Sequence, residues 1–506
     1  SPIDPRKPPV VMHGSSDRQI PPRPCRRLPK QIPMKNSREF KRMLCIAGLL
    51  MWAMAASHST TLRADDLKTP YRIQVVDEDS GWPVPLVELK TTNELRFISD
   101  NAGVIAIDAP SLMGHEVWFT VVGHGYGVPP DAFGYRGIRL TPLPGESVQV
   151  PVTRFSLAKR IGRLTGSGLF EESQKLGEEA DWIDAPLAGC DSVQTAMHRG
   201  KLFWAWGDTK FANYPLGVFD MISATTSLQP LDSQQPPLHP RFNYFTSSQG
   251  KPRAVADMPG NGPTWLTGYA SLKDAAGTEH LVATYRKIEG RLDTYEIGLC
   301  VWNEATLEFD HLRTVWKKSS GEPPPFWTRE GHAAVETDHQ GVEWLYVGNP
   351  LPHTRVRATF EAWQQPSEWE ELTPPTSLGV VDSPREVQPH SGSIAWNAYR
   401  QRWVTVFMQK FGTPSPFGTL WYAEAVSPTG PWGPAVEILS HENYTFYNPR
   451  LHPEFTEPDS SVLFFEGTYT AQFSDHANPT PLHDYNQILY RLDLDEMALP
   501  AALPSN

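Results

Sequence analysis

The chain has 506 residues, of which 40% are hydrophobic and 20% charged, so it is long enough for two or three domains with large buried cores. Its formal net charge of -12, with no long basic run beyond the N-terminal region, argues against nucleic acid as a partner. The 49 Pro and 37 Gly suit an all-β chain with many turns.

The N-terminal 64 residues have the composition of an extension followed by a signal peptide. Residues 1–33 are rich in Pro and Arg and lack periodicity, which is typical of a disordered segment. A basic stretch and the apolar run 43–56 follow, with small-residue cleavage sites near Ala56 or Asp65. We predict a signal peptide over 34–64, a true start at Met34 and an upstream extension assigned in error.

This signal peptide predicts a secreted protein, periplasmic or extracellular, with no stable membrane anchor after cleavage. The apolar run is too short and wrongly flanked for an ordinary membrane span. The alternative is a signal anchor that stays uncleaved.

Residues 70–154 are predicted to form a small β domain. Short strands at Arg72–Asp77, Leu86–Leu89 and Val104–Ile107 are separated by turn segments rich in Gly, Pro and Asp. This order, with Gly-x-Pro-Val-Pro after the first strand and Ser-Asp-x-x-Gly before the third, resembles the carboxypeptidase regulatory-like, transthyretin-like β-sandwich. The resemblance implies an accessory domain of a secreted enzyme or surface protein.

Residues 155–182 differ from the segments on either side. Apolar side chains recur near helical spacing at Phe155, Ala158, Ile161 and Leu164, and charged residues follow them. This spacing predicts a helical connector between two domains.

From 183 to 496 one pattern recurs about every 55–75 residues, which lies in the range of propeller repeats. Each unit begins at a polar cluster and continues through aromatic strands. Five units predict an all-β, five-bladed β-propeller, followed by a tail over 497–506. The units begin near Asp191, Thr264, Glu330, His390 and Tyr447.

The first unit opens with a β-hairpin over 189–209. Apolar side chains alternate on both arms, and Arg199-Gly200 supplies the turn. Counting back from this turn places Asp191 opposite Asp208, with Cβ atoms about 4.5–5.5 Å apart. Two carboxylates so close repel each other and raise one pKa, which favours an acid/base site. The alternative is that both Asp residues only cap strand ends in turns.

The hairpin contains Gly-x-Asp, a hydrophobic strand, Gly-Lys-Leu, an aromatic-rich strand and Gly-Asp-Thr. It resembles a family of secreted bacterial five-bladed β-propellers, long catalogued as a domain of unknown function, that includes endo-D-arabinanases. The resemblance covers the hairpin firmly and the rest of the propeller diffusely. It implies that Asp191 and Asp208 are the catalytic pair and that a polysaccharide or oligosaccharide is the substrate.

The innermost strands of a propeller converge on one funnel, so residues at their leading ends meet in space. A third carboxyl, Glu330, is therefore an alternative acid, or else a surface charge at a blade edge. A close carboxyl pair at about 5–5.5 Å implies a retaining glycosidase, and the cross-strand estimate for the Asp pair leans that way. The side chains predicted to hold sugar hydroxyls in the funnel are His332, His390, Tyr447, Asn448 and Arg450.

The sequence contains no HExxH, GxSxG or P-loop motif, so zinc proteolysis, serine-esterase chemistry and nucleotide hydrolysis have no support. We predict no cofactor and no metal; a calcium ion on the propeller axis stays open. Cys190 and Cys300 either pair or remain two buried thiols. The alternative to a glycoside hydrolase is a non-catalytic propeller that binds carbohydrate or protein.

Overall fold

The computed structural model describes residues 69–497 except 228–229, 232–233, 414, 442–443, 472, 474–481 and 483. The predicted extension (1–33), the signal peptide (34–64) and all of the tail but Met497 lie outside these residues. Within the described part, no helix is long and apolar enough to cross a membrane.

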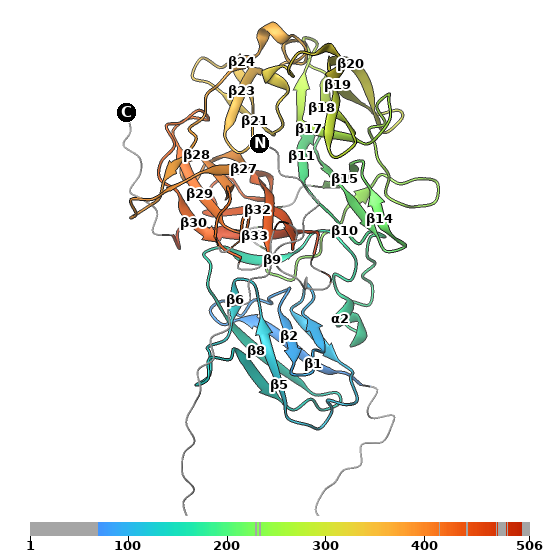
Figure 1. The fold of residues 1–506 in the computed structure, drawn as a ribbon, viewed down its shortest axis with the longest axis vertical. Coiled ribbons are helices and arrows are strands. Elements are labelled where there is room, and N and C mark those ends of the chain that lie inside the picture. Colours follow the sequence, from blue (N-terminus) through green and yellow to red (C-terminus); the bar gives the residue numbers. More distant parts are fainter. Residues whose placement is uncertain are drawn as a thin grey trace, which may run out of the picture. The chain divides into compact units, whose positions relative to one another are not determined.

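The first described domain is a β-sandwich of two four-stranded sheets, as predicted (Figure 1). Alternate side chains of its strands face a common core that includes Ile73, Leu89 and Phe119. One sheet has the order β4 (Val104–Ile107), β1 (Tyr71–Asp77), β8 (Ser147–Arg154), β6 (Tyr126–Gly127). The other has the order β3 (Arg96–Ile98), β2 (Glu88–Thr91), β5 (Val117–Val122), β7 (Gly137–Leu140).

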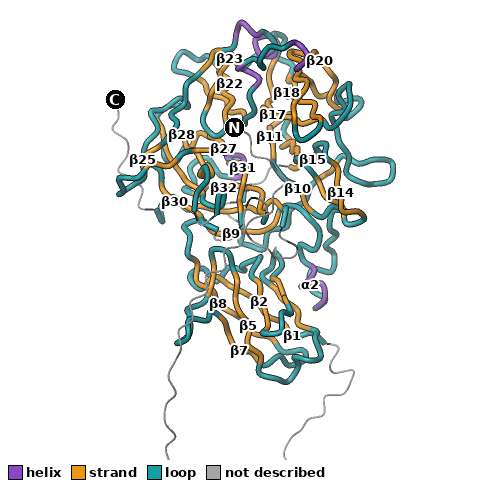
Figure 2. The backbone as a smooth tube through the Cα atoms, in the orientation of Figure 1, coloured by secondary structure: helices purple, strands orange, loops and turns teal. Residues whose placement is uncertain are grey.

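The second domain contains five four-stranded antiparallel sheets, which confirms the prediction of a five-bladed β-propeller (Figure 2). Blade 1 contains β11 (Val193–His198), β12 (Lys201–Trp206), β15 (Ile222–Ser227) and β16 (Asn243–Tyr244). Blade 2 contains β17 (Thr264–Lys273), β18 (Glu279–Glu289), β19 (Asp293–Asn303) and β20 (Glu308–Lys317). Blade 3 contains β21 (His332–Thr337), β22 (Glu343–Gly348), β23 (Pro352–Arg357) and β24 (Glu370–Glu371).

Blade 4 contains β27 (Pro389–Asn397), β28 (Arg402–Gln409), β29 (Leu420–Ala425) and β30 (Val436–Leu439). Blade 5 contains β31 (Thr445–Leu451), β32 (Val462–Thr470), β33 (Asn486–Asp493) and β9 (Lys159–Arg163). The inner strand of each blade contacts the inner strand of the next, and β31 contacts β11. The inner strands therefore form a closed ring.

Strand β9 corrects the prediction of a helical connector over 155–182. It pairs with β33, with Ile488 opposite Arg163, and so completes the last blade with a segment from before the first. The only α-helix described in 155–182 is the five-residue α2 (Glu171–Lys175). The local apolar spacing is that of a helix. The segment forms a strand because the open edge of β33, far away in the sequence, supplies hydrogen-bond partners for its backbone, and a local pattern cannot show this.

Strand β9 contains two buried arginines, which is unusual for a strand inside a domain. Arg163 donates hydrogen bonds to the carbonyl oxygens of Gly168 (2.7 Å) and Ser167 (2.9 Å). Arg160 donates to the carbonyl oxygen of Gly123 over 2.6 Å. Both guanidinium groups are buried and hydrogen-bonded, as a buried charge requires.

Smaller elements extend the blades. The hairpin of blade 1 continues into a three-stranded sheet, with strands β10 (Gly189–Cys190), β13 (Thr209–Phe211) and β14 (Tyr214–Val218). The remaining elements are β25 (Leu378–Gly379), β26 (Glu386–Val387), α3 (Phe360–Trp363), η2 (Lys318–Ser320), η3 (Phe326–Thr328), η4 (Pro366–Glu368) and η5 (Pro453–Phe455). Cys190 and Cys300 are both buried free thiols, so the two do not form a disulfide.

Candidate active site

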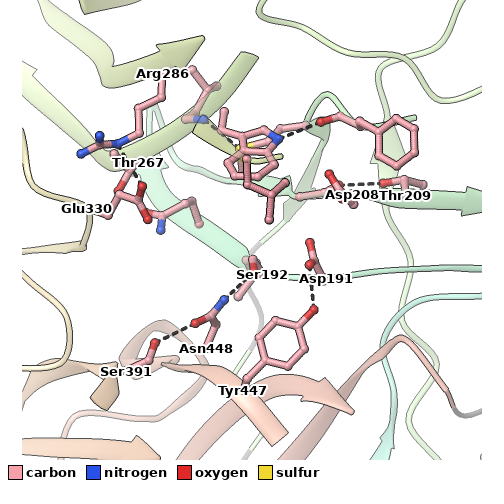
Figure 3. A pocket seen from close by; sticks show the side chains of 18 of the residues that line it. Asp191, Ser192, Asp208, Thr209, Thr267, Arg286, Glu330, Ser391, Tyr447 and Asn448 are labelled. Carbon is pink, nitrogen blue, oxygen red and sulfur yellow. Dashed lines mark hydrogen bonds and ion pairs between the residues drawn. The ribbon is translucent and has the colours of Figure 1, made fainter. Parts of the chain in front are cut away.

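A cavity of about 450 Å³ opens where the inner strands converge, and all five blades contribute to its wall (Figure 3). Most of the polar residues predicted from the sequence lie on this wall, although they are scattered along the chain from Asp191 to Asn448. The predicted residues that line it are Asp191, Asp208, Glu330, His332, Tyr447 and Asn448.

Asp191 and Asp208 lie opposite each other, as the hairpin count predicted. Val193 pairs with Trp206 on one side of them, and Cys190 pairs with Thr209 on the other. The backbone N–H of Asp191 donates to the carbonyl oxygen of Asp208 over 3.1 Å. Both acids lie at the junction between the hairpin and the small sheet, and both face the cavity.

Asp191 is held in its position by hydroxyl groups. Tyr447 donates a 2.7 Å hydrogen bond to Asp191 Oδ2, and Tyr485 donates a further bond to the same carboxylate. Burial raises the pKa of Asp191, while these two bonds and the charge of Lys210 oppose the rise. The ammonium of Lys210 lies 4.2 Å from the centre of the Tyr485 ring, and this cation–π contact helps to hold both side chains in place.

Asp208 has a different environment. Its Oδ1 atom is buried and makes no hydrogen bond among the described residues. Burial, then the charges of Asp191 and Asp220, raise the pKa of Asp208 to about 7. The negative charge of Asp191 thus helps to raise the pKa of Asp208, whereas the hydroxyl bonds to Asp191 favour its anion.

Gly207 permits this arrangement. A Cβ atom built on Gly207 would overlap Asp191 Oδ1, so any side chain here would displace the carboxylate from its tyrosine partners. The backbone N–H of Gly207 also donates to the carbonyl oxygen of Asp191 over 2.8 Å. A glycine is required because the Asp191 carboxylate approaches the backbone so closely.

Glu330 faces the same cavity but is paired. Its Oε1 lies 3.0 Å from Nε of Arg286, whose guanidinium is buried, while the Glu330 side chain is 59% exposed. This ion pair with a buried guanidinium suits a structural or binding role for Glu330.

The opposite rim of the cavity carries amides and hydroxyls. Asn448 Nδ2 donates to Ser192 Oγ over 2.6 Å, and Ser391 Oγ lies 2.8 Å from both Asn448 Oδ1 and Asn349 Oδ1 (Figure 3). This network spans blades 1, 3, 4 and 5 and presents short polar groups of the kind that bind sugar hydroxyls.

His390 and Arg450, both predicted to line the funnel, are absent from the wall of the cavity. His390 instead stacks on Phe417, with ring centres 5.1 Å apart. Arg450 is buried and donates to Thr195 Oγ1 over 3.2 Å. A register shift lies beside each residue, between Pro389 and Ser391 in β27 and between Tyr447 and Arg450 in β31. Such bulges break the regular alternation of side chains along a strand, so a place near the leading end of the strand does not ensure that a side chain faces the funnel.

Arg450 belongs to an ionic cluster with His452, Glu454 and Glu466. His452 lies 2.9 Å from Glu454 and 3.1 Å from Glu466, so its pKa is raised even though burial opposes its charge. Burial raises the pKa of Glu466, whose Oε2 has no partner among the described residues. Among all residues that the structure describes, no three His, Cys, Asp or Glu side chains are placed to share a metal ion.

His332 lines the cavity as a neutral imidazole. Burial, followed by the charges of Arg450 and His452, holds its pKa well below the usual value. Its Nδ1 atom is buried and without a hydrogen-bond partner among the described residues. A neutral imidazole has one nitrogen that donates a hydrogen bond and one that accepts, as contacts to sugar hydroxyls require.

Four further residues line the cavity without having been predicted from the sequence: Tyr485, Lys210, Arg286 and Trp265. Lys210 lies two residues after the predicted Asp208, and Trp265 follows Thr264, the predicted start of the second unit. Tyr485 lies in the turn before β33. Arg286 lies in the second strand of its blade, where the argument from leading strand ends cannot find it.

No protein-family model and no curated protein matches the chain. Among solved structures, a Bifidobacterium bifidum protein described as a candidate exo-β-1,3-galactanase has a TM-score of 0.38 at 13% identity, covering 66% of this chain and 92% of its own. An exo-1,5-α-L-arabinanase from a bovine ruminal metagenomic library has a TM-score of 0.35 at 12% identity, covering 61% and 94%.

An N-acetylgalactosamine deacetylase from F. plautii, in complex with blood group B trisaccharide, has a TM-score of 0.38 at 9% identity, covering 66% and 95%. The names of these three proteins describe different reactions. Similarity this low carries no argument about activity, so function must be argued from the site itself.

Proposed function

We propose that the chain is a glycoside hydrolase in which Asp208 is the general acid and Asp191 the nucleophile. The observation that supports this is the contrast between the two carboxyls. Tyrosine hydroxyls hold one as an anion, while burial keeps a proton on the other to a pKa of about 7. Two carboxyl groups with pKa values pushed apart are what glycoside cleavage needs.

The reaction proposed is a double displacement. Asp208 transfers its proton to the glycosidic oxygen as the bond from that oxygen to the anomeric carbon breaks, and Asp191 bonds to the carbon. Asp208, now ionised, then takes a proton from a water molecule, which attacks the anomeric carbon and frees Asp191. Both carboxyls face one cavity from opposite positions of the hairpin, which supports a retaining course, in which the two carboxyls lie close together.

The proposed substrate is a polysaccharide or oligosaccharide. Asn448, Ser391 and Asn349 present amide and hydroxyl groups, and His332 adds an imidazole to the wall. Sugar hydroxyls both donate and accept hydrogen bonds, so a wall of such mixed groups suits them. We further propose that the chain acts after secretion, directed by the segment 34–64.

Digestion of a polysaccharide panel tests the proposal. The panel contains D-arabinan, 1,5-α-L-arabinan, β-1,3-galactan and arabinoxylan, and the measurement is release of reducing ends by the purified protein and by Asp191→Asn. We expect at least one polysaccharide to be cleaved by the unmodified protein and none by the variant. Binding of a polysaccharide without release of reducing ends would instead indicate a non-catalytic propeller.

A further inference from the structure

A second cavity, of about 710 Å³, adjoins the first on the side of blade 2. The two cavities share four lining residues, so they are compartments of one continuous groove. The shared residues are Asp208, Phe219, Trp265 and Leu292. The second cavity is otherwise enclosed by the loop 260–263, the end of β18, Gly290 and Tyr295.

The boundary between the two cavities is apolar and partly exposed. Phe219 is 47% exposed and Leu292 is 70% exposed. Trp265 is half-buried, and its indole N–H donates to the carbonyl oxygen of Phe219 over 2.8 Å, which fixes the orientation of the ring. Exposed aromatic surface that lines a groove commonly marks a ligand site. The C–H face of a sugar ring packs on such a surface, while its hydroxyls stay in water.

The far wall of the second cavity is preformed. Tyr295 OH donates to the carbonyl oxygen of Asn261 over 2.7 Å, and Lys287 Nζ donates to that of Gly262 over 2.6 Å. These two bonds hold the loop 260–263 against β18 and β19. A ligand therefore finds the wall in place and pays little ordering entropy on binding.

The position of Asp208 assigns a role to this cavity. A general acid must lie beside the oxygen of the departing group, because it protonates that oxygen as the bond breaks. Asp208 lines both cavities, whereas Asp191 lines only the first. The sugar that reacts with Asp191 therefore lies in the first cavity, and the part of the chain that departs lies toward the second.

Resting on the function proposed above, we infer that the second cavity is the binding site for the leaving-group side of a saccharide chain. Trp265 is its stacking platform, with Phe219 and Leu292 beside it. The occupant is the continuation of the same saccharide toward its reducing end, since a glycosidase releases that end as the leaving group.

Kinetics of Trp265→Ala test this inference. The probes are oligosaccharides labelled at the reducing end, prepared by partial acid hydrolysis of the polysaccharide that the unmodified protein cleaves. A second probe is the glycosyl fluoride of the sugar that occupies the first cavity, whose fluoride leaving group is too small to reach the second. Trp265→Phe keeps an aromatic face, and Trp396→Ala removes a Trp that is 44% exposed in β27, outside both cavities.

We expect Trp265→Ala to lower kcat/KM for the labelled oligosaccharides by about tenfold, the upper range for one ring contact. We also expect its labelled products to change in length. Because Trp265 also borders the first cavity, the loss on the fluoride should be smaller than the loss on the oligosaccharides, with recovery in Trp265→Phe and no effect in Trp396→Ala. Equal losses on both probes, or unchanged rates and products, would overturn the inference while leaving the proposed function standing. Failure of the unmodified protein to cleave any polysaccharide would instead remove the proposed function and this inference with it.

Discussion

Tyr447 donates a 2.7 Å hydrogen bond to Asp191 Oδ2 across 256 positions of sequence, from the inner strand of the last blade to the start of the first. This bond stabilises the carboxylate anion and lowers its pKa against the effect of burial. It therefore connects closure of the propeller ring to the charge state of the proposed nucleophile.

Tyr447→Phe is expected to move the acidic limb of the pH–rate profile. Without the hydroxyl the pKa of Asp191 rises, and because Asp191 must be ionised to react, kcat/KM falls at a higher pH than in the unmodified protein. A loss of about tenfold at pH 5, smaller at pH 7, is expected from removal of one hydrogen bond to a charged group. The measurement is kcat/KM between pH 4 and pH 8, with Tyr399→Phe, which lies outside the cavity, as the control. An unchanged acidic limb would show that this bond does not set the pKa that controls the reaction.

Asp208→Asn is expected to stabilise the fold at neutral pH and not at acid pH. The folded-state pKa of Asp208, about 7, lies above its ordinary value of 3.8, so folding favours the protonated form. The stability of the unmodified protein consequently falls as pH rises from 3.8 toward about 7, and the variant lacks this loss. Melting temperatures at pH 4, 6 and 8 measure the effect, with the exposed Asp459→Asn as the control. A lower melting temperature at every pH would favour the alternative that Asp208 only caps a strand end.

Gly207→Ala is expected to reduce activity by about a hundredfold, because its new Cβ would displace the Asp191 carboxylate from Tyr447 and Tyr485. Gly379→Ala is the matched control, since a Cβ built there meets no atom within 4 Å. Both variants are compared by kcat/KM on the cleaved polysaccharide and by melting temperature. Full activity in Gly207→Ala would show that the position of Asp191 does not matter to the reaction.

The segment before the described residues yields a prediction about processing. If 34–64 is a signal peptide, the protein recovered outside the producing cell begins near Ala56 or Asp65. N-terminal sequencing of the secreted protein checks this directly. Recovery of a chain that begins at Ser1 would rule out cleavage at either site.

Local patterns were enough to predict the Asp191–Asp208 register and the five blade starts. Both depend on alternation within one hairpin or on the recurrence of polar strand ends, which the sequence records directly. The wrong or missed features depend on long-range partners. Strand β9 forms because β33 has an open edge, and Tyr485 reaches Asp191 only after the ring closes.

His390 and Arg450 lie away from the predicted wall for a different reason. The bulges beside them add a residue to one strand, which turns the following side chains away from the expected face. Asn448 lies within the bulge of β31 at a φ of 51°, a conformation that Asn tolerates better than most residues. A count by twos along β31 therefore fails past Tyr447.

In the proposed reaction Asp208 donates the proton and Asp191 attacks. Its most direct test compares Asp208→Asn and Asp191→Asn on the cleaved polysaccharide and on the 2,4-dinitrophenyl glycoside of the same sugar, whose leaving group needs no proton. We predict that Asp208→Asn loses the polysaccharide reaction and keeps the formation of the glycosyl-enzyme from the dinitrophenyl glycoside, seen as a burst of dinitrophenolate, whereas Asp191→Asn loses both. A folded Asp208→Asn that cleaves the polysaccharide at the unmodified rate would contradict the account.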